Sequence, residues 1–168
     1  MAASPKQQFL ESFDREHATT MRVLRAFPKD KADTKLHPNI KTPKELAWVF
    51  VMECGLGMRV WNDELASGIP AGSKPPSPPD KWDDLLAAVE KQSGEYRALV
   101  SSTPDAKFSE DVHFMTGPKK MGPISRINWA WFMLHDQIHH RGQFSTYLRM
   151  SGGKVPSIYG PTADEPWT

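Results

Sequence analysis

The sequence has only one cysteine, Cys54, among its 168 residues. No intramolecular disulfide can form, and no metal site can be built from cysteine ligands. A single cysteine inside an apolar segment is more often a small hydrophobic residue than a nucleophile. We therefore assign Cys54 to the core.

Charge of one sign and long apolar runs are also lacking. The formal net charge is +1, which gives no indication of the basic surface typical of nucleic-acid binding. No uninterrupted apolar run approaches the length of a membrane span. The first residues lack the charged-then-apolar pattern of a signal peptide. We expect a cytoplasmic protein that binds neither nucleic acid nor membrane.

The proportions of hydrophobic and charged residues are ordinary, whereas the prolines are unevenly distributed along the chain. Hydrophobic residues make up 39% and charged residues 24%, as in a globular protein, and the length suits a single domain over residues 1–168. The 15 prolines fall mostly between apolar segments, where they separate candidate helices.

Two helices are expected in the first part of the chain. Ser4-Pro5-Lys6-Gln7 has the form of a helix start, and apolar residues follow at helical spacing until Pro28. Thr42 and Glu45 form a capping box that opens a second helix to about Leu65. This second helix is apolar on most sides, which predicts deep burial.

Two more helices are expected in the second part. Asp80 caps a third helix that ends at Thr103. A fourth runs over about 123–150, ending before Gly152. Residues 67–79 form a Pro-rich linker, residues 105–122 a loop with at most one short strand, and residues 152–168 an extended tail. The fold class is all-α, an up-down four-helix bundle with long connecting loops.

The predicted fourth helix carries the most distinctive polar residues. Asp136 and His140 are four residues apart, so a carboxylate and an imidazole share one face, with Gln143 and Tyr147 on the same stripe. That stripe also takes in Trp129 and Met133, and the core face opposite it comprises Ile127, Trp131, Leu134, Ile138 and Ser145. Spacing of this kind suits two ligands of one metal ion.

A second pair of histidines leaves the ligand set open. His135 and His139 are also four residues apart, rotated toward a flank of the helix. Either pair suits a metal, and the same histidines can instead fill space and form hydrogen bonds.

Glu53 is the best candidate for a third ligand. It is the only acidic residue between Glu45 and Asp63, in the middle of the most apolar helix. A buried carboxylate is costly unless it is paired or bound to a metal. The alternative is an ion pair with Arg141 or with another buried arginine. The other histidines are weaker candidates: we expect His17 in the core and His37 and His113 in loops.

Two strings in the last third of the chain resemble one family. Ile138-His-His-Arg-Gly-Gln-Phe-Ser-Thr-Tyr-Leu-Arg149 and Val155-Pro-Ser-Ile-Tyr-Gly-Pro-Thr-Ala-Asp-Glu165 are similar to the DinB-like (YfiT-type) family, as is the start of the second helix. The resemblance implies a four-helix bundle, often a homodimer. It further implies a divalent metal, zinc or nickel, held by three side chains. Similar proteins include transferases that use low-molecular-weight thiols.

The chain departs from the family pattern at two positions. The family's helix-two histidine is matched by Val49, and the position four residues before the motif histidine, His140, is Asp136. A carboxylate at that position is chemically acceptable. Glu53, one turn after Val49, is then the residue able to replace the missing histidine.

Two functions follow from these observations. The first is a metal-dependent thiol S-transferase or hydrolase, in which Asp136, His140 and Glu53 hold the metal and Gln143 and Tyr147 orient a small-molecule substrate. In this first hypothesis, Arg141 pairs with a substrate anion or with an acidic residue. The second is a non-enzymatic dimeric bundle that binds a small ligand or a partner, with a degenerate metal site.

Overall fold

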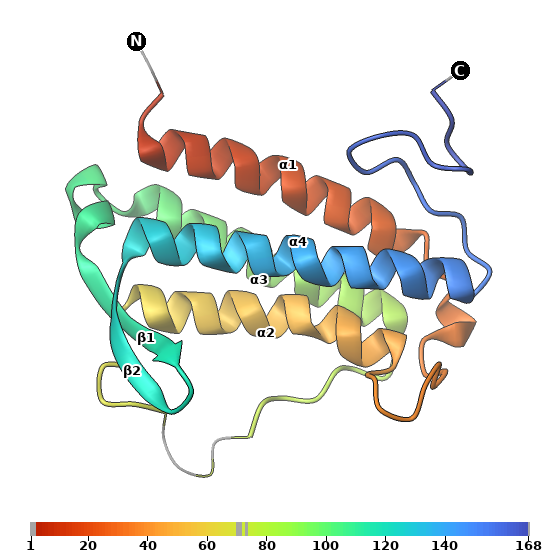
Figure 1. The fold of residues 1–168 in the computed structure, drawn as a ribbon, viewed down its shortest axis with the longest axis horizontal. Helices are drawn as coiled ribbons and strands as arrows, with labels where there is room; N and C mark the ends of the chain where they lie inside the picture. The colour runs from red at the N-terminus through yellow and green to blue at the C-terminus, as the bar shows by residue number, and fades with distance from the viewer. Residues whose placement is uncertain (1–2, 70–71, 73, 168) are drawn as a thin grey trace.

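Four long helices lie side by side in the computed structural model, which describes residues 3–69, 72 and 74–167 (Figure 1). They are α1 (Pro5–Arg25), α2 (Pro43–Trp61), α3 (Trp82–Ser102) and α4 (Arg126–Met150). Two strands, β1 (Asp111–Gly117) and β2 (Lys120–Ser125), and two short 3-10 turns, η1 (Lys29–Lys31) and η2 (Asp105–Ser109), complete the elements. The predicted four-helix bundle with long connecting loops is confirmed.

The helix starts follow local capping chemistry. Ser4 Oγ accepts a hydrogen bond from the Gln7 amide at 3.2 Å, and Thr42 and Glu45 form the predicted reciprocal capping box. The prediction for Asp80 was wrong: Lys81 is the N-cap of α3 and provides no side-chain bond. Packing explains this start, because Trp82 is already buried against Phe27 and Phe144.

The connection between α2 and α3 gives these two helices the same direction. Cys54 Sγ of α2 lies 3.6 Å from Ser93 Oγ of α3. Later along both helices, Trp61 Nε1 donates to Thr103 Oγ1 at 2.9 Å, so the two helices run parallel. The described residues between α2 and α3, 62–69, 72 and 74–81, therefore return along the bundle before α3 begins (Figure 1). The directions are up-down-down-up, with the predicted Pro-rich linker as the long return. Residues 70, 71 and 73 of that linker lie outside the described residues.

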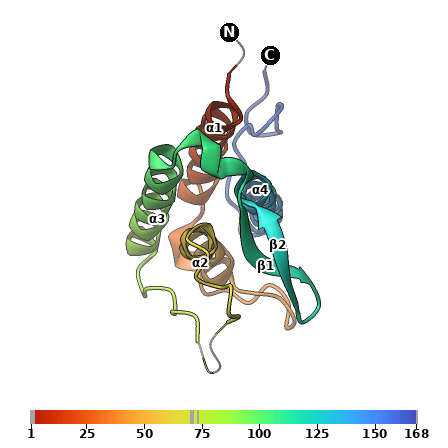
Figure 2. The ribbon, with the colours of Figure 1, turned by 90° about the vertical axis from the view of Figure 1, so that its left-hand side faces the viewer.

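A β-hairpin occupies a segment for which the sequence predicted a loop, and that prediction was wrong. Strands β1 and β2 pair antiparallel, with Val112 opposite Ile124 and Phe114 opposite Gly122. The predicted fourth helix begins at Arg126, after β2 rather than at residue 123. Figure 2 shows the hairpin beside α2 and α4, which both contact it. The hairpin thus covers one end of the α2–α4 interface.

The core consists of two apolar clusters separated by a polar level. One cluster lies toward the hairpin and includes Phe9, Phe13, Tyr96, Trp129 and Met133. The other lies toward the opposite end and includes Leu24, Phe50, Trp82, Phe144 and Leu148. The buried polar residues of the described chain all lie between them: Glu16, Thr20, Ser93, Gln137 and Arg141. These five residues form a polar level that crosses the bundle about halfway along the helices.

The tail after α4 has no helix or strand among its described residues and folds back along the bundle. Glu165 pairs with Arg22 of α1 at 3.0 Å, and Asp164 pairs with Arg149 of α4. The tail therefore closes over the side of the bundle where α1 meets α4 (Figure 1). No helix of the described chain is both long and apolar enough to cross a membrane.

Candidate metal centre

Three polar side chains meet between α2 and α4, about halfway along the two helices. Glu53 Oε1 lies 3.2 Å from His140 Nε2, and Asp136 Oδ1 lies 3.8 Å from the same nitrogen. One ligand atom from each of these three residues lies within 4.8 Å of the others. The antiparallel packing of α2 on α4 creates this cluster, because it sets Glu53 opposite the turn that joins Asp136 to His140.

Glu53 is the most constrained member of the cluster. Its side chain is 11% exposed, and both carboxylate oxygens are removed from solvent. Among the described residues no donor makes a well-formed hydrogen bond to either oxygen. Burial raises the pKa of Glu53 to about 7, although the facing His140 opposes the shift. A carboxylate in this position needs a cation or a proton.

Both nitrogens of His140 are engaged. The facing Glu53 carboxylate raises the pKa of this imidazole above its ordinary value. On the other side of the ring, Nδ1 lies 3.2 Å from Gln143 Oε1. Because the amide oxygen only accepts, Nδ1 carries the hydrogen, and Nε2 is the nitrogen that faces the two carboxylates.

The donor set fits a divalent metal ion. Two ligand atoms about 2.1 Å from one ion at a tetrahedral angle lie roughly 3.4 Å apart, close to the distances from His140 Nε2 to the two carboxylates. Imidazole and carboxylate are both ordinary zinc ligands. The Asp136 side chain is 44% exposed, so the cluster reaches solvent on the Asp136 side. The structure therefore brings together the predicted trio Glu53, Asp136 and His140.

The rest of α4 is rotated relative to the prediction. The buried face runs through Ala130, Leu134, Gln137, Arg141 and Leu148, and it also takes in Trp129 and Met133. Of the predicted core face Leu134 is buried, whereas Ile127, Trp131, Ile138 and Ser145 are only partly buried, so the prediction was wrong for those four residues. Since α1, α2 and the hairpin all pack against α4, its buried face is broad and a single apolar stripe cannot locate it.

The remaining predicted site residues of α4 lie outside the trio. His135 and His139 are exposed, and neither belongs to the three-residue cluster. His139 Nε2 does contact Gln143 Nε2 at 2.9 Å, which links it indirectly to His140. Tyr147 donates to the backbone carbonyl of Lys41 at 3.2 Å. Its hydroxyl holds the loop before α2 against α4.

Arg141 faces away from the trio, toward α1. Its guanidinium lies 2.8 Å from Glu16 Oε2, and the Tyr159 hydroxyl contacts both side chains, at 2.6 and 2.7 Å. The predicted alternative of an ion pair between Glu53 and Arg141 is therefore wrong. Glu16 was not predicted as a site residue, although it stands where the α1 pattern from Phe9 and Phe13 requires a buried residue.

Cys54 lies in the polar level of the core, with Gln137 and Ser93 as its polar neighbours. Cys54 Sγ accepts a hydrogen bond from Gln137 Nε2 at 3.4 Å and lies beside Ser93. Burial raises the pKa of the Cys54 thiol to about 11, so the thiol stays protonated at neutral pH. This agrees with the assignment of Cys54 to the core.

The other histidines lie apart from the trio. His17 stacks on Phe13 with ring centroids 6.2 Å apart, and burial lowers its pKa. His37 accepts a bond from the Asn39 amide at 3.2 Å. His113 lies in β1 rather than in a loop, where its Nδ1 is 3.0 Å from Asp63.

Comparisons with known proteins agree with the family resemblance and with the fold. A sequence model of the DinB family matches residues 70–167. The chain is 25% identical over 158 residues to YrdA, an uncharacterized protein of Bacillus subtilis, covering 94% of this chain and 89% of YrdA. A DinB-like protein from Bacillus cereus has the same fold, with a TM-score of 0.71, 21% identity and coverage of 90% and 95%. The DinB-like protein YjoA of Bacillus subtilis also has this fold, with a TM-score of 0.69 and 16% identity; the match covers 90% of this chain and 96% of YjoA.

Proposed function

The chain belongs to the DinB family, and on that premise we propose that it is a metal-dependent enzyme whose centre is Glu53, Asp136 and His140. One observation carries the proposal. Glu53 holds a carboxylate with both oxygens buried and facing a histidine nitrogen, an arrangement that a divalent cation satisfies. We propose zinc or nickel, which accept imidazole together with carboxylate ligands.

The chemistry that such an ion supplies is Lewis acidity, which lowers the pKa of a coordinated thiol or water. The chain's own residues do the rest. Gln143 accepts the Nδ1 hydrogen of His140 and keeps Nε2 directed at the carboxylates. Asp136 leaves one side of the centre open to solvent, where a substrate can approach. We propose S-transfer or hydrolysis as the reaction class, with a low-molecular-weight thiol as one substrate, and a homodimer as the assembly.

Metal content tests this proposal. Purified protein is dialysed against zinc or nickel and then against buffer, and bound metal is measured by elemental analysis. Wild-type protein is expected to keep about one ion per chain, whereas Glu53→Gln, Asp136→Asn and His140→Ala lose it. His135→Ala is the matched control, because His135 is an exposed histidine one residue before Asp136. Wild-type protein without stoichiometric metal would contradict the proposal.

A second candidate function has one observation in its favour. The family resemblance matches Val49 to the helix-two histidine, and a valine side chain offers no ligand atom. In this alternative the bundle is a non-enzymatic binding module, and Glu53, Asp136 and His140 form a hydrogen-bonded group. It predicts that zinc leaves the melting temperature of wild-type protein unchanged. A rise in melting temperature that disappears in Asp136→Asn excludes it.

A further inference from the structure

An exposed aromatic ring adjoins the candidate metal centre. Phe132 lies one helical turn before Asp136, so the two side chains are neighbours on one face of α4, with Cβ atoms about 5–6 Å apart. Phe132 is 48% exposed, which is unusual for a phenylalanine. Asp136 marks the solvent side of the centre, and the exposed ring therefore borders that opening.

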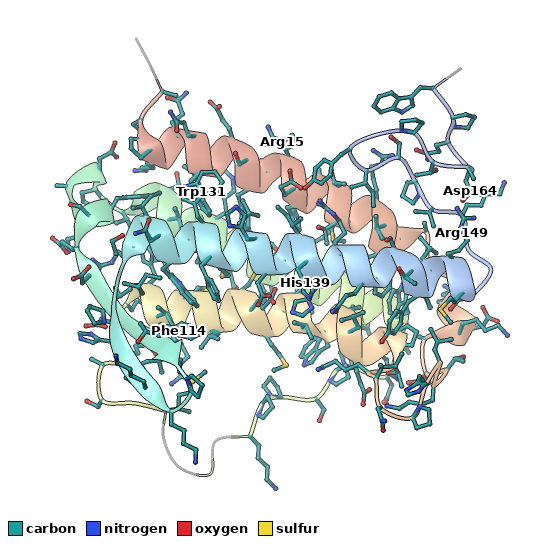
Figure 3. The ribbon with its side chains drawn as sticks, in the orientation of Figure 1. Arg15, Phe114, Trp131, His139, Arg149 and Asp164 are labelled. Atoms are coloured by element: carbon teal, nitrogen blue, oxygen red, sulfur yellow. The ribbon has the colours of Figure 1, made fainter. Side chains whose placement is uncertain are left out.

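The ring is held firmly by other aromatic side chains. Phe132 stacks on Trp129 at 5.7 Å between centroids and lies 6.0 Å from Phe114 of the hairpin. Phe114 in turn contacts Trp129 at 4.4 Å, and Trp129 is 1% exposed. The hairpin, whose Phe114 is labelled in Figure 3, thus supports one edge of the ring. A fixed exposed ring offers apolar area that loses little side-chain entropy on binding.

The size of this surface favours a small molecule over a second protein chain. An aromatic side chain offers about 150–250 Å², so the exposed part of Phe132 is roughly 100 Å². A stable protein interface needs about 800 Å² from each partner. The neighbouring Met115 adds nothing here, because side chains alternate along β1 and Met115 points to the opposite face from Phe114. The exposed area matches one flat ring.

We propose that Phe132 is the specificity-determining residue of the centre and binds an aromatic or flat apolar group of the substrate. The substrate class is an organic molecule with an oxygen or sulfur donor at one end and a ring about one helical turn away. The donor end approaches the open side of Glu53, Asp136 and His140, and the ring stacks on Phe132. This inference rests on the proposed metal centre and names what that centre accepts.

Two hydroxamates provide the test, because they share one metal-binding head and differ in one group. Zinc-loaded protein is titrated with acetohydroxamate and with benzohydroxamate by calorimetry. Stacking and ring burial predict that benzohydroxamate binds roughly five- to tenfold more tightly. In Phe132→Ser the advantage disappears while acetohydroxamate binds as before. Met150→Ser is the matched control, since Met150 is an exposed apolar residue at the far end of α4.

Each contrary outcome points to a different failure. If acetohydroxamate binds and benzohydroxamate has no advantage that depends on Phe132, the aromatic subsite is wrong and the metal centre stands. If neither compound binds because the protein takes up no zinc, the proposed function fails, and this inference fails with it. Light scattering adds a third arm. A dimer that becomes a monomer in Phe132→Ser shows that a second copy covers the ring, which also overturns the proposal.

Discussion

Gln143 contacts two histidines through one amide group. Its Nε2 lies 2.9 Å from His139 Nε2 and its Oε1 lies 3.2 Å from His140 Nδ1. Because the amide nitrogen donates to His139, the oxygen is the atom left for His140. His139 thereby fixes the amide, and the amide fixes the tautomer of His140. An exposed histidine outside the trio thus has a defined effect on it.

This arrangement predicts the effect of removing the acceptor. Gln143→Leu keeps the volume of the side chain but leaves the Nδ1 hydrogen of His140 without a partner, so the affinity for zinc is expected to fall about 10- to 100-fold. Competition against a chromophoric chelator measures it. Gln92→Leu is the control, because Gln92 is on α3 and bonds only to Glu95 among the described residues. Unchanged affinity in Gln143→Leu would show that His140 needs no outer support.

Glu16 predicts a pH-dependent stability on the opposite side of α4. Burial opposes ionisation of Glu16, but bonds from Tyr159 and Arg141 outweigh it and hold its pKa below the ordinary 4.5. The stabilisation is therefore complete above pH 4.5 and is lost as pH falls through the lowered pKa of the folded state. At pH 7 Glu16→Gln is expected to cost about 3–5 kcal/mol, because it leaves Arg141 buried and uncompensated.

Urea unfolding of Glu16→Gln and wild-type protein at pH 7 and at pH 3.5 checks this expectation. The difference between the two proteins should shrink at pH 3.5, below the ordinary pKa of 4.5, because the unfolded wild-type chain then binds a proton that the ion pair with Arg141 resists in the folded state. Glu11→Gln serves as the control, since Glu11 is an exposed residue on the same helix. An equal difference at both pH values would mean that the charge of Glu16 contributes nothing.

Glycines on two neighbouring helices have opposite requirements. A Cβ added to Gly57 of α2 would lie 2.4 Å from Met133 Sδ and 3.0 Å from the Tyr96 ring, whereas one added to Gly94 of α3 meets nothing within 4 Å. Gly57→Ala is expected to lower the free energy of unfolding by about 1–3 kcal/mol through overpacking. Gly94→Ala should raise it by about 1 kcal/mol through helix propensity.

Chemical denaturation of the two variants compares the same substitution in two environments. Met133 is flexible and can shift, but Tyr96 is fully buried and cannot. Whether Gly57→Ala lowers or raises the free energy of unfolding therefore depends on Tyr96. A stabilised Gly57→Ala would show that α2 and α3 can separate slightly without cost. In that case the close approach of these parallel helices would not depend on glycine.

Features decided by nearby residues were predictable from the sequence, whereas those decided by distant partners were not. The Thr42–Glu45 capping box lies within one turn, and Glu53 stands out because its own helix is apolar. The bundle and the family resemblance built on residues 138–149 were also predictable and are confirmed. By contrast, Arg141 contacts Glu16 across 125 residues, and no local pattern encodes that pairing.

The hairpin was missed for a similar reason. Gly122 and Pro123 are typical of a helix start when they are considered alone. Gly122 is instead needed in β2 because Thr116 of β1 lies 2.7 Å from where a Cβ would be. Only the pairing of the two strands shows this requirement. The structure of residues 111–125 therefore depends on the pairing of β1 with β2, which no local sequence pattern indicates.

At the scale of the whole molecule, the polar level divides the core into two apolar clusters. It contains the Glu16–Arg141 pair on one side of α4, Glu53 and His140 on the other, and Cys54 with its neighbours between them. Such a level lowers the apolar burial available to a bundle of this size. The Arg141 side has its charges paired within the chain. On the Glu53 side the carboxylate faces His140 but has no well-formed hydrogen bond among the described residues, and the metal ion is the partner that we propose for it.

This difference predicts that one substitution has opposite effects without and with metal. Glu53→Met removes a buried carboxylate that lacks a well-formed hydrogen bond, so the metal-free variant is expected to be about 1–2 kcal/mol more stable than wild-type protein. Zinc at about 100 times its dissociation constant should stabilise wild-type protein by about 2.7 kcal/mol and leave Glu53→Met unchanged. The order of stability therefore inverts when zinc is added, as urea unfolding can measure.

Asp136→Asn separates the two parts of that prediction. Because the Asp136 side chain is half-exposed, its replacement should change the metal-free stability little and still remove the gain from zinc. A metal-free Glu53→Met that is less stable than wild-type protein would mean that His140 alone supports the carboxylate, as the non-enzymatic alternative requires. A buried carboxylate that weakens the metal-free bundle and strengthens the loaded one is instead what a metal ligand should be, because its cost is offset only when the ion binds.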